Sequence, residues 1–154
     1  MTLILFVCRG NTCRSPMAEA LARDAARRAG RDGGITFASA GVAPSPIGGP
    51  AHTRACTCMA HRGLDLGAHR SRLADVALVS GAGRVFALDR MVRDDLVKTA
   101  PQARITLLLD LIPQLGLADV ADPWHGTAAD YDVACSLIET AVAALIADMQ
   151  WDDA

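Results

Sequence analysis

Four short apolar runs recur along the chain, separated by longer segments in which apolar residues follow a helical spacing. Each run has the length and composition of a buried strand. The predicted strands are Leu3–Val7, Ile35–Ala38, Arg84–Leu88 and Ile105–Leu109. Because strands that alternate with helices form parallel βαβ units, the pattern predicts an α/β fold, a three-layer α/β/α sandwich.

The segments between these runs predict five helices. They are Pro16 to about Arg28, Ala51–Arg62, Arg72–Val79, Asp89–Ala100 and Ala129 to about Met149. Gly30 and Pro101 end the first and the fourth. Glu19 is expected in the first turn of the first helix, where a carboxylate favours the positive end of the dipole. In the amphipathic last helix the pattern predicts core contacts for Val133, Leu137, Val142, Leu145 and Ile146.

Two connections differ from the rest in composition and length. A Pro- and Gly-rich segment, Pro44 to Pro50, is expected to be an exposed loop. The stretch from Leu111 to Asp122 is a long connection, and a loop of this length in a compact domain is usually functional.

Composition describes an ordinary globular protein and argues against several classes. The 154 residues are 51% hydrophobic and 21% charged, which predicts one domain over residues 1–154 rather than a disordered chain. The net charge is −2 and no basic stripe carries interleaved aromatics, so no nucleic-acid partner is expected. No apolar run approaches the roughly twenty residues needed to cross a bilayer, so no membrane association is expected either. The first residues lead into a strand without the features of a signal peptide, which predicts a cytoplasmic protein.

The five cysteines do not follow the pattern of a disulfide or zinc framework. They are Cys8, Cys13, Cys56, Cys58 and Cys135, and an odd number in a chain expected to be cytosolic argues against structural disulfides. Cys56 and Cys58 lack a second pair at finger-like spacing, so no metal is expected. Together with Cys135 they lie in predicted helices, where they are interpreted as packing residues.

The segment from Cys8 to Pro16 joins the first strand to the first helix and carries most of the chemistry. A strand, a Gly-containing loop and a helix N-terminus form an anion site, because several backbone N–H groups converge there. Arg14 can hold two oxygens of a tetrahedral oxyanion in its planar guanidinium. Cys8, at the same place, is expected to be a thiolate at neutral pH. The pattern therefore favours a nucleophile within a phosphate cradle over a structural cysteine in an ordinary turn.

The loop reads Cys8-Arg9-Gly10-Asn11-Thr12-Cys13-Arg14-Ser15. It resembles the signature of the low-molecular-weight protein-tyrosine-phosphatase family. The family includes a protein-arginine-phosphatase branch, and the resemblance covers about residues 2–149. It implies a four-stranded parallel sheet in the order 2-1-3-4 and no cofactor. It also implies that Cys8 is the nucleophile and that the phosphate is bound by Arg9, Gly10, Asn11, Thr12, Cys13 and Arg14.

A proton donor is also required, and Asp122 is the best candidate. Most Asp-Pro pairs are simple turns, but here Pro123 stiffens the loop and Trp124 offers a flat apolar face to a substrate. The resemblance implies that Asp122 is the general acid, because the family carries this residue in an Asp-Pro-aromatic element before the last helix. Trp124 and His125 would then form a wall of the substrate pocket.

Further residues match family positions that support the loop. Ser39 and His69 match residues that hydrogen-bond beneath it, although His69 by itself is more typical of a surface or capping histidine. With Asn11 and Ser15 they would hold the loop rigid and support the thiolate. Cys13 matches a cysteine that forms a reversible disulfide with the nucleophile, which would protect Cys8 from over-oxidation. A small buried loop residue is the alternative interpretation of Cys13.

Several positions depart from tyrosine-directed members and leave the substrate open. Arg9 stands where a neutral residue is usual, Thr12 where many members have isoleucine, and His125 where a second tyrosine is frequent. The loop from Val42 to Gly49 lacks the aromatic residue that lines one pocket wall in several members.

The sequence as a whole predicts a cysteine-dependent protein-tyrosine phosphatase. It would hydrolyse phosphotyrosine on a protein through a phosphocysteine intermediate and release inorganic phosphate. A protein-arginine phosphatase is the alternative, because Thr12 and the Ser39–Val42 stretch resemble that branch. A thiol-dependent arsenate reductase would need two more cysteines after the third strand, and Arg84–Leu96 contains none. A non-catalytic phosphoprotein-binding module would require the loss of Cys8 or Asp122, and the oligomeric state is left open.

Overall fold

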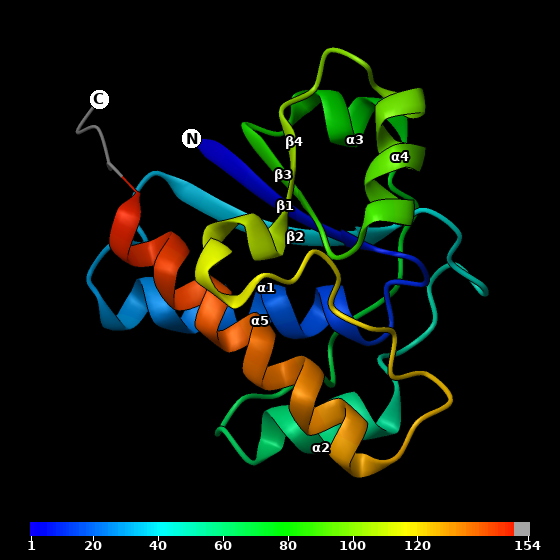
Figure 1. Ribbon diagram of the computed structural model, residues 1–154, viewed down its shortest axis with the longest axis vertical. Coiled ribbons are helices and arrows are strands. Elements are labelled where there is room, and N and C mark those ends of the chain that lie inside the picture. The colour runs from blue at the N-terminus through cyan, green and yellow to red at the C-terminus, as the bar shows by residue number, and fades with distance from the viewer. Residues whose placement is uncertain (150–154) are drawn as a thin grey trace.

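The computed structural model describes residues 1–149, which fold around a parallel sheet (Figure 1). The four strands are β1 Thr2–Cys8, β2 Ile35–Gly41, β3 Arg84–Ala87 and β4 Ile105–Leu107. Their order is β2-β1-β3-β4 and every neighbouring pair is parallel. The predicted sheet, including its strand order, is confirmed.

Strand β1 is buried on both faces because its side chains alternate between two cores. Ile4 and Phe6 belong to one hydrophobic cluster, whereas Leu5 and Val7 belong to the other. A strand covered on both sides is apolar at every position. This is why β1 is recognisable in the sequence as a continuous apolar run.

Two layers of helices cover the sheet (Figure 1). Helices α1 Arg14–Arg28, α2 Thr53–Ala60 and α5 Ala128–Asp148 pack on one face, and helices α3 Val76–Gly81 and α4 Arg90–Thr99 pack on the other. Two short 3-10 helices, η1 Leu108–Leu111 and η2 Pro113–Leu115, follow β4. The three-layer prediction is confirmed. Among the helices of residues 1–149, none has the length and apolar character needed to cross a membrane.

Helix α1 begins earlier than predicted. It starts at Arg14 rather than Pro16, with Cys13 at the N-cap position. No acidic residue lies in its first turn, so the placement of Glu19 there is wrong. The earlier start makes Arg14 the first residue of the helix, directly at the end of the Cys8 loop.

The helix predicted over Arg72–Val79 begins only at Val76. Asp75 caps it by accepting a hydrogen bond from the N–H of Leu78 at 2.8 Å. The preceding residues are extended along the end of β2, because the N–H of Gly41 donates to the carbonyl of Arg72 at 2.9 Å and the N–H of Ala74 donates to the carbonyl of Gly41 at 2.8 Å. Pairing with the sheet replaces the first helical turn.

The prediction that Val133 contacts the core is wrong. The other predicted contacts of α5 are confirmed, since Val142, Leu145 and Ile146 are buried and Leu137 packs against the same cluster. Val133 is 62% exposed. Helix α5 buries Tyr131, Ala134 and Cys135 on the face that packs against the core, and Val133 lies on the opposite, exposed face.

Candidate active site

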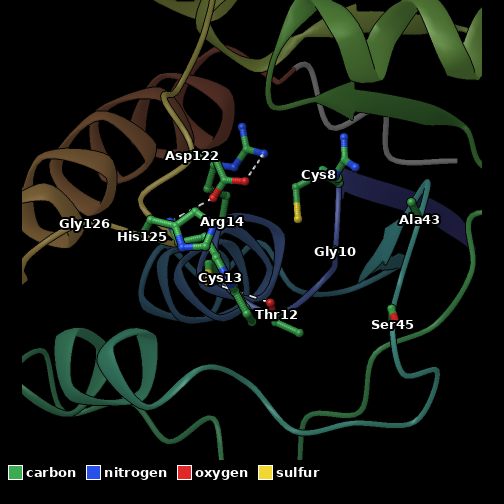
Figure 2. A pocket seen from close by; sticks show the side chains of 12 residues that line it. Cys8, Gly10, Thr12, Cys13, Arg14, Ala43, Ser45, Asp122, His125 and Gly126 are labelled. Carbon is green, nitrogen blue, oxygen red and sulfur yellow. Dashed lines mark hydrogen bonds and ion pairs between the residues drawn. The ribbon is translucent and has the colours of Figure 1, made fainter.

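The loop from Cys8 to Arg14 lies at the carboxyl end of β1, which is where parallel sheets bind ligands. It lines a pocket of about 580 Å³ together with two other connections. The lining consists of Cys8, Arg9, Gly10, Thr12, Cys13 and Arg14 from the loop, Ala43 and Ser45 after β2, and Asp122, Trp124, His125 and Gly126 before α5. Figure 2 shows the Cys8 sulfur pointing into this pocket.

The Cys8 sulfur is held by two polar neighbours. Its Sγ atom lies 3.0 Å from Ser15 Oγ and accepts a hydrogen bond from the N–H of Asn11 at 3.2 Å. The residue is only 2% exposed. When Ser15 donates its proton, both contacts stabilise negative charge on the sulfur.

Asn11 is the buried support of the loop. Its side-chain amide donates to Ser15 Oγ at 2.8 Å and to Ser39 Oγ at 3.0 Å, and its Oδ1 accepts from the N–H of Arg72 at 3.0 Å. His69 Nε2 lies 2.7 Å from the Asn11 carbonyl oxygen. The structure thus brings together the four residues predicted to support the loop. The sequence predicts two roles for Asn11, binding the phosphate and supporting the loop. Its side chain lies behind the pocket lining, where its hydrogen bonds fit the supporting role.

The loop also needs an unusual backbone and a close neighbour without a side chain. Asn11 has a φ angle of 55°, in the left-handed region that asparagine tolerates better than most residues. Gly41, at the end of β2, passes so close that a Cβ atom there would lie 2.7 Å from the Arg9 carbonyl oxygen and 2.9 Å from the Asn11 nitrogen. Only glycine leaves room for the loop at this point.

The Arg14 guanidinium is buried and fixed by oxygen atoms from two segments, the turn between β3 and α4 and the connection before α5. Its Nη1 donates to Asp89 Oδ2 at 2.7 Å and to the Val120 carbonyl at 2.8 Å, and its Nη2 lies 3.6 Å from Asp122 Oδ2. Burial by itself would lower the pKa of Arg14, but the negative charges of Cys8, Asp89 and Asp122 outweigh it and raise the pKa. The pocket therefore contains a permanent and well-oriented cation.

Asp122 faces the Arg14 guanidinium and stays open to solvent. Its Oδ1 accepts a hydrogen bond from the N–H of Trp124 at 3.0 Å, and its side chain is 42% exposed. In Figure 2, Asp122 and His125 lie on one side of the Cys8 sulfur, and Ala43 and Ser45 lie on the other. A carboxyl group in this position can exchange a proton with a group bound in the pocket. Within residues 1–149, no three His, Cys, Asp or Glu side chains are grouped as ligands for a metal ion.

A further network connects Cys13 to the pocket wall. Cys13 Sγ lies 3.3 Å from the Tyr131 hydroxyl, and the Tyr131 ring stacks on His52 with centroids 5.2 Å apart. His52 also contacts the Trp124 ring edge-on at 5.0 Å and donates its backbone N–H to the Thr12 carbonyl at 2.9 Å. Burial raises the pKa of Cys13, although hydrogen bonds from Tyr131 and Thr12 oppose this. Cys13 is thus held on the side of α5, within a packed aromatic cluster.

The sequence pattern assigns no role to Tyr131, His52 or Gly41, because their partners are distant in the chain. Asp89 also belongs to the site, and its position matches a Met-Asp pair that recurs after the third strand in the family that the loop resembles, with Leu88 here in place of the methionine. A signal for it is present in the sequence, since Asp89 follows the third predicted strand directly and therefore stands at the same edge of the sheet as the Cys8 loop.

The comparison with known proteins identifies the family. The protein-family model described as "Low molecular weight phosphotyrosine protein phosphatase" matches residues 3–154. The chain belongs to this family. It is therefore a phosphatase, and the family expected from the loop sequence is confirmed.

Relatives of this low-molecular-weight phosphatase fall into two kinds. The chain is 33% identical over 153 residues to the low-molecular-weight protein-tyrosine-phosphatase YfkJ of Bacillus subtilis, covering 97% of each protein. It is also 33% identical over 148 residues to the protein-arginine-phosphatase of Geobacillus stearothermophilus, covering 96% of this chain and 95% of that one. Because both identities are equal, overall similarity does not choose between the two substrates.

Solved structures give the same result. The crystal structure of Bacillus subtilis YfkJ superposes with a TM-score of 0.92 at 32% identity, covering 100% of this chain and 98% of that one. A mutant of the arginine phosphatase YwlE, in which serine replaces a cysteine and the active-site serine is phosphorylated, superposes with a TM-score of 0.89 at 28% identity. That match covers 99% of this chain and 98% of the other.

Proposed function

We propose that this phosphatase hydrolyses phosphorylated protein side chains through a phosphocysteine formed on Cys8. The observation that supports this most strongly is that Cys8 and Arg14 share one pocket in which the Asp122 carboxylate lies 3.6 Å from the Arg14 guanidinium. These three residues provide a nucleophile, a cation for the phosphoryl oxygens and a proton donor.

In the first step the Cys8 thiolate attacks phosphorus in line with the leaving group. A sulfur–phosphorus bond forms while the bond from phosphorus to the leaving atom breaks. Arg14 and the backbone N–H groups of residues 9–14 would hold the equatorial oxygens, where negative charge is concentrated. Protonated Asp122 donates its proton to the leaving atom, which departs as part of a neutral phenol or guanidine.

In the second step water releases the phosphate. Asp122, now a carboxylate, takes a proton from water as the oxygen attacks the phosphocysteine. The sulfur–phosphorus bond breaks, inorganic phosphate forms and Cys8 returns to the thiolate. The phosphorylated active-site serine of the YwlE mutant supports the first step, because in that protein the phosphoryl group is carried by the active-site residue.

Phosphotyrosine is the substrate that we propose first. Trp124 is half exposed at the pocket and offers its ring face to an aromatic substrate. Arg9 adds a positive charge at the lining, which favours the doubly negative phosphotyrosine over phosphoarginine, whose guanidinium offsets part of the phosphoryl charge. The similarity to YfkJ, named a tyrosine phosphatase, is consistent with this choice.

Phosphoarginine is the second candidate, favoured by the residues on the remaining walls. Thr12 brings a hydroxyl group to the pocket, and Ala43 and Ser45 are small where an aromatic wall would grip a phenyl ring. A guanidinium group has several N–H donors, and the hydroxyl groups of Thr12 and Ser45 and the carboxylate of Asp122 could accept hydrogen bonds from them. The protein-arginine-phosphatase of Geobacillus stearothermophilus is an equally similar relative.

Two assays test the proposal. Cys8→Ser should lower kcat for p-nitrophenyl phosphate by about a thousandfold or more, because the nucleophile is lost, while Cys56→Ser on α2 should retain wild-type activity. Undiminished hydrolysis by Cys8→Ser would contradict the mechanism. One peptide sequence carrying either phosphotyrosine or phosphoarginine at the same position then decides the substrate, because the larger kcat/KM identifies the preferred group.

A further inference from the structure

A second hollow adjoins the active-site pocket and shares two residues with it. This hollow, which we call the α5 groove, measures about 340 Å³, and Asp122 and Gly126 line both cavities. Its apolar lining consists of Leu117, Ala121, Pro123, Val133, Ala134 and Leu137. The loop that carries the candidate acid is therefore a wall of both sites.

Two large apolar side chains of the α5 groove are open to solvent. Leu117 is 48% exposed and Val133 is 62% exposed. They come from different segments, the connection after η2 and the first half of α5, and they meet at one hollow. Apolar residues gathered in a hollow, rather than scattered singly, are typical of an interaction site. The groove also accounts for Val133, whose apolar character the core does not use.

The charged side chains that line the α5 groove carry one sign. They are Asp119, Asp122 and Asp130, and within residues 1–149 no basic residue belongs to the lining. Arg90 pairs with Asp119 at 3.1 Å, and Arg14 lies 3.6 Å from Asp122 but is shared with Asp89. The two arginines pair with three carboxylates, and Asp130 adds a fourth, so a group bound in the groove meets net negative charge and a cation is favoured.

We propose that the α5 groove binds the peptide segment that flanks the phosphorylated residue, and that it selects an apolar side chain next to a lysine or arginine. The proposal rests on the proposed function, because the phosphorylated residue must occupy the adjoining pocket. A peptide leaving that pocket over Asp122 and Gly126 reaches the groove directly, since both residues line each cavity. The apolar side chain would lie between Leu117 and Val133, and the cationic one would face the aspartates of the groove.

Four phosphopeptides test this selection. They share one phosphorylated residue and carry, at the flanking positions, either leucine or glycine combined with either lysine or glutamate. We expect leucine to raise kcat/KM over glycine by about tenfold, the usual effect of an apolar contact in a pocket. Lysine should exceed glutamate by about threefold, and this preference should shrink as salt is added because exposed charges are screened. Equal values for all four peptides would overturn the proposal.

A pair of variants assigns the effect to the groove. Val133→Asp should remove the preference for leucine and strengthen the preference for lysine, when each kcat/KM is divided by the same variant's value for p-nitrophenyl phosphate. Val97→Asp is the matched control, since Val97 is a similarly exposed valine on α4 outside the groove, and it should keep the wild-type preferences. Thermal unfolding of both variants verifies that they are folded.

The remaining outcomes separate this inference from the proposed function. If p-nitrophenyl phosphate is hydrolysed and the four peptides have equal kcat/KM values, the phosphatase mechanism stands and only the proposed peptide binding in the groove is overturned. If the protein hydrolyses none of these substrates, the proposed function itself is overturned. If Val133→Asp changes the oligomeric state in size-exclusion chromatography and leaves the peptide preferences as in wild type, the groove joins copies of this chain and the proposal is wrong.

Discussion

Asp89 divides its carboxylate between Arg14 and the start of helix α4. Its Oδ2 lies 2.7 Å from Arg14 Nη1, and its Oδ1 accepts the N–H of Val92 at 2.8 Å. Strand β3, which ends just before Asp89, pairs with β1, which ends at Cys8. One side chain therefore fixes the guanidinium in the same frame that positions the candidate nucleophile.

Replacing this carboxylate separates its two roles. Asp89→Asn keeps an oxygen for the cap of α4 but removes the charge that orients Arg14, so we expect kcat to fall at least about tenfold. Steady-state kinetics with p-nitrophenyl phosphate measure this loss. Asp75→Asn is the control, because Asp75 caps α3 in the same way without contacting the site, and it should leave kcat unchanged. An equal loss in both variants would assign the effect to capping.

The close approach of Gly41 to the loop predicts a strong effect of one methyl group. Gly41→Ala places its Cβ against backbone atoms of Arg9 and Asn11, which cannot rotate away. We expect the free energy of unfolding to fall by about 1–3 kcal/mol and activity to fall with it. Gly33→Ala is the control, since its Cβ would meet no heavy atom within 4 Å. Thermal unfolding measures the stability of both variants. A Gly41→Ala variant as stable as the Gly33→Ala variant would contradict the close approach of Gly41 to the loop.

Asn11 contributes both its side chain and its backbone conformation, and two substitutions distinguish them. Asn11→Gly keeps the left-handed conformation but leaves Ser15 and Ser39 without the amide donor, at a cost of about 1–3 kcal/mol. Asn11→Ala adds the strain of a Cβ at positive φ, a further cost of about 1 kcal/mol. Denaturant unfolding should therefore rank wild type above the glycine variant and the glycine variant above the alanine variant. An alanine variant at least as stable as the glycine variant would show that the φ angle of 55° carries no strain.

Asp122→Asn tests the proton donor without disturbing Trp124. The amide oxygen can still accept the N–H of Trp124, but it has no proton to donate. We expect kcat/KM, which reports the first step and not the later release of phosphate, to fall by about 10²–10⁴ for phenyl phosphate, whose leaving group needs protonation. The loss should be clearly smaller for p-nitrophenyl phosphate, because nitrophenolate leaves without help. Equal losses for the two substrates would argue that Asp122 acts in some other way.

The predicted redox role of Cys13 has a direct test. A peroxide would oxidise the Cys8 thiolate to a sulfenic acid, and the Cys13 thiol would condense with it to a disulfide and release water. Wild-type activity should then return fully with dithiothreitol, whereas Cys13→Ser should lose activity irreversibly through over-oxidation. Cys56→Ser is the control and should recover like wild type. Equal recovery of the Cys13→Ser variant would leave Cys13 as a packing residue beside Tyr131.

The errors of the sequence predictions have a common physical cause. The segment from Arg72 to Ala74 has helical spacing, but hydrogen bonds to Gly41 at the end of β2 hold it extended. Val133 is apolar, yet the face of α5 that packs on the core carries Tyr131, Ala134 and Cys135 and leaves Val133 at the surface. In both cases the outcome depends on a partner elsewhere in the chain, and local pattern contains no information about that partner.

The sequence by itself determined the elements whose signal is local. Strand β1 is apolar from Leu3 to Val7 because this part is covered on both faces. The loop from Cys8 to Ser15 is contiguous, so the order of residues alone suffices to recognise the family and the candidate nucleophile. Only the tertiary structure decided which oxygen atoms hold Arg14, that Gly41 must be glycine and that Tyr131 reaches Cys13. Those contacts join residues far apart in the chain, and they arise only when the parallel strands bring their carboxyl ends to one edge of the sheet.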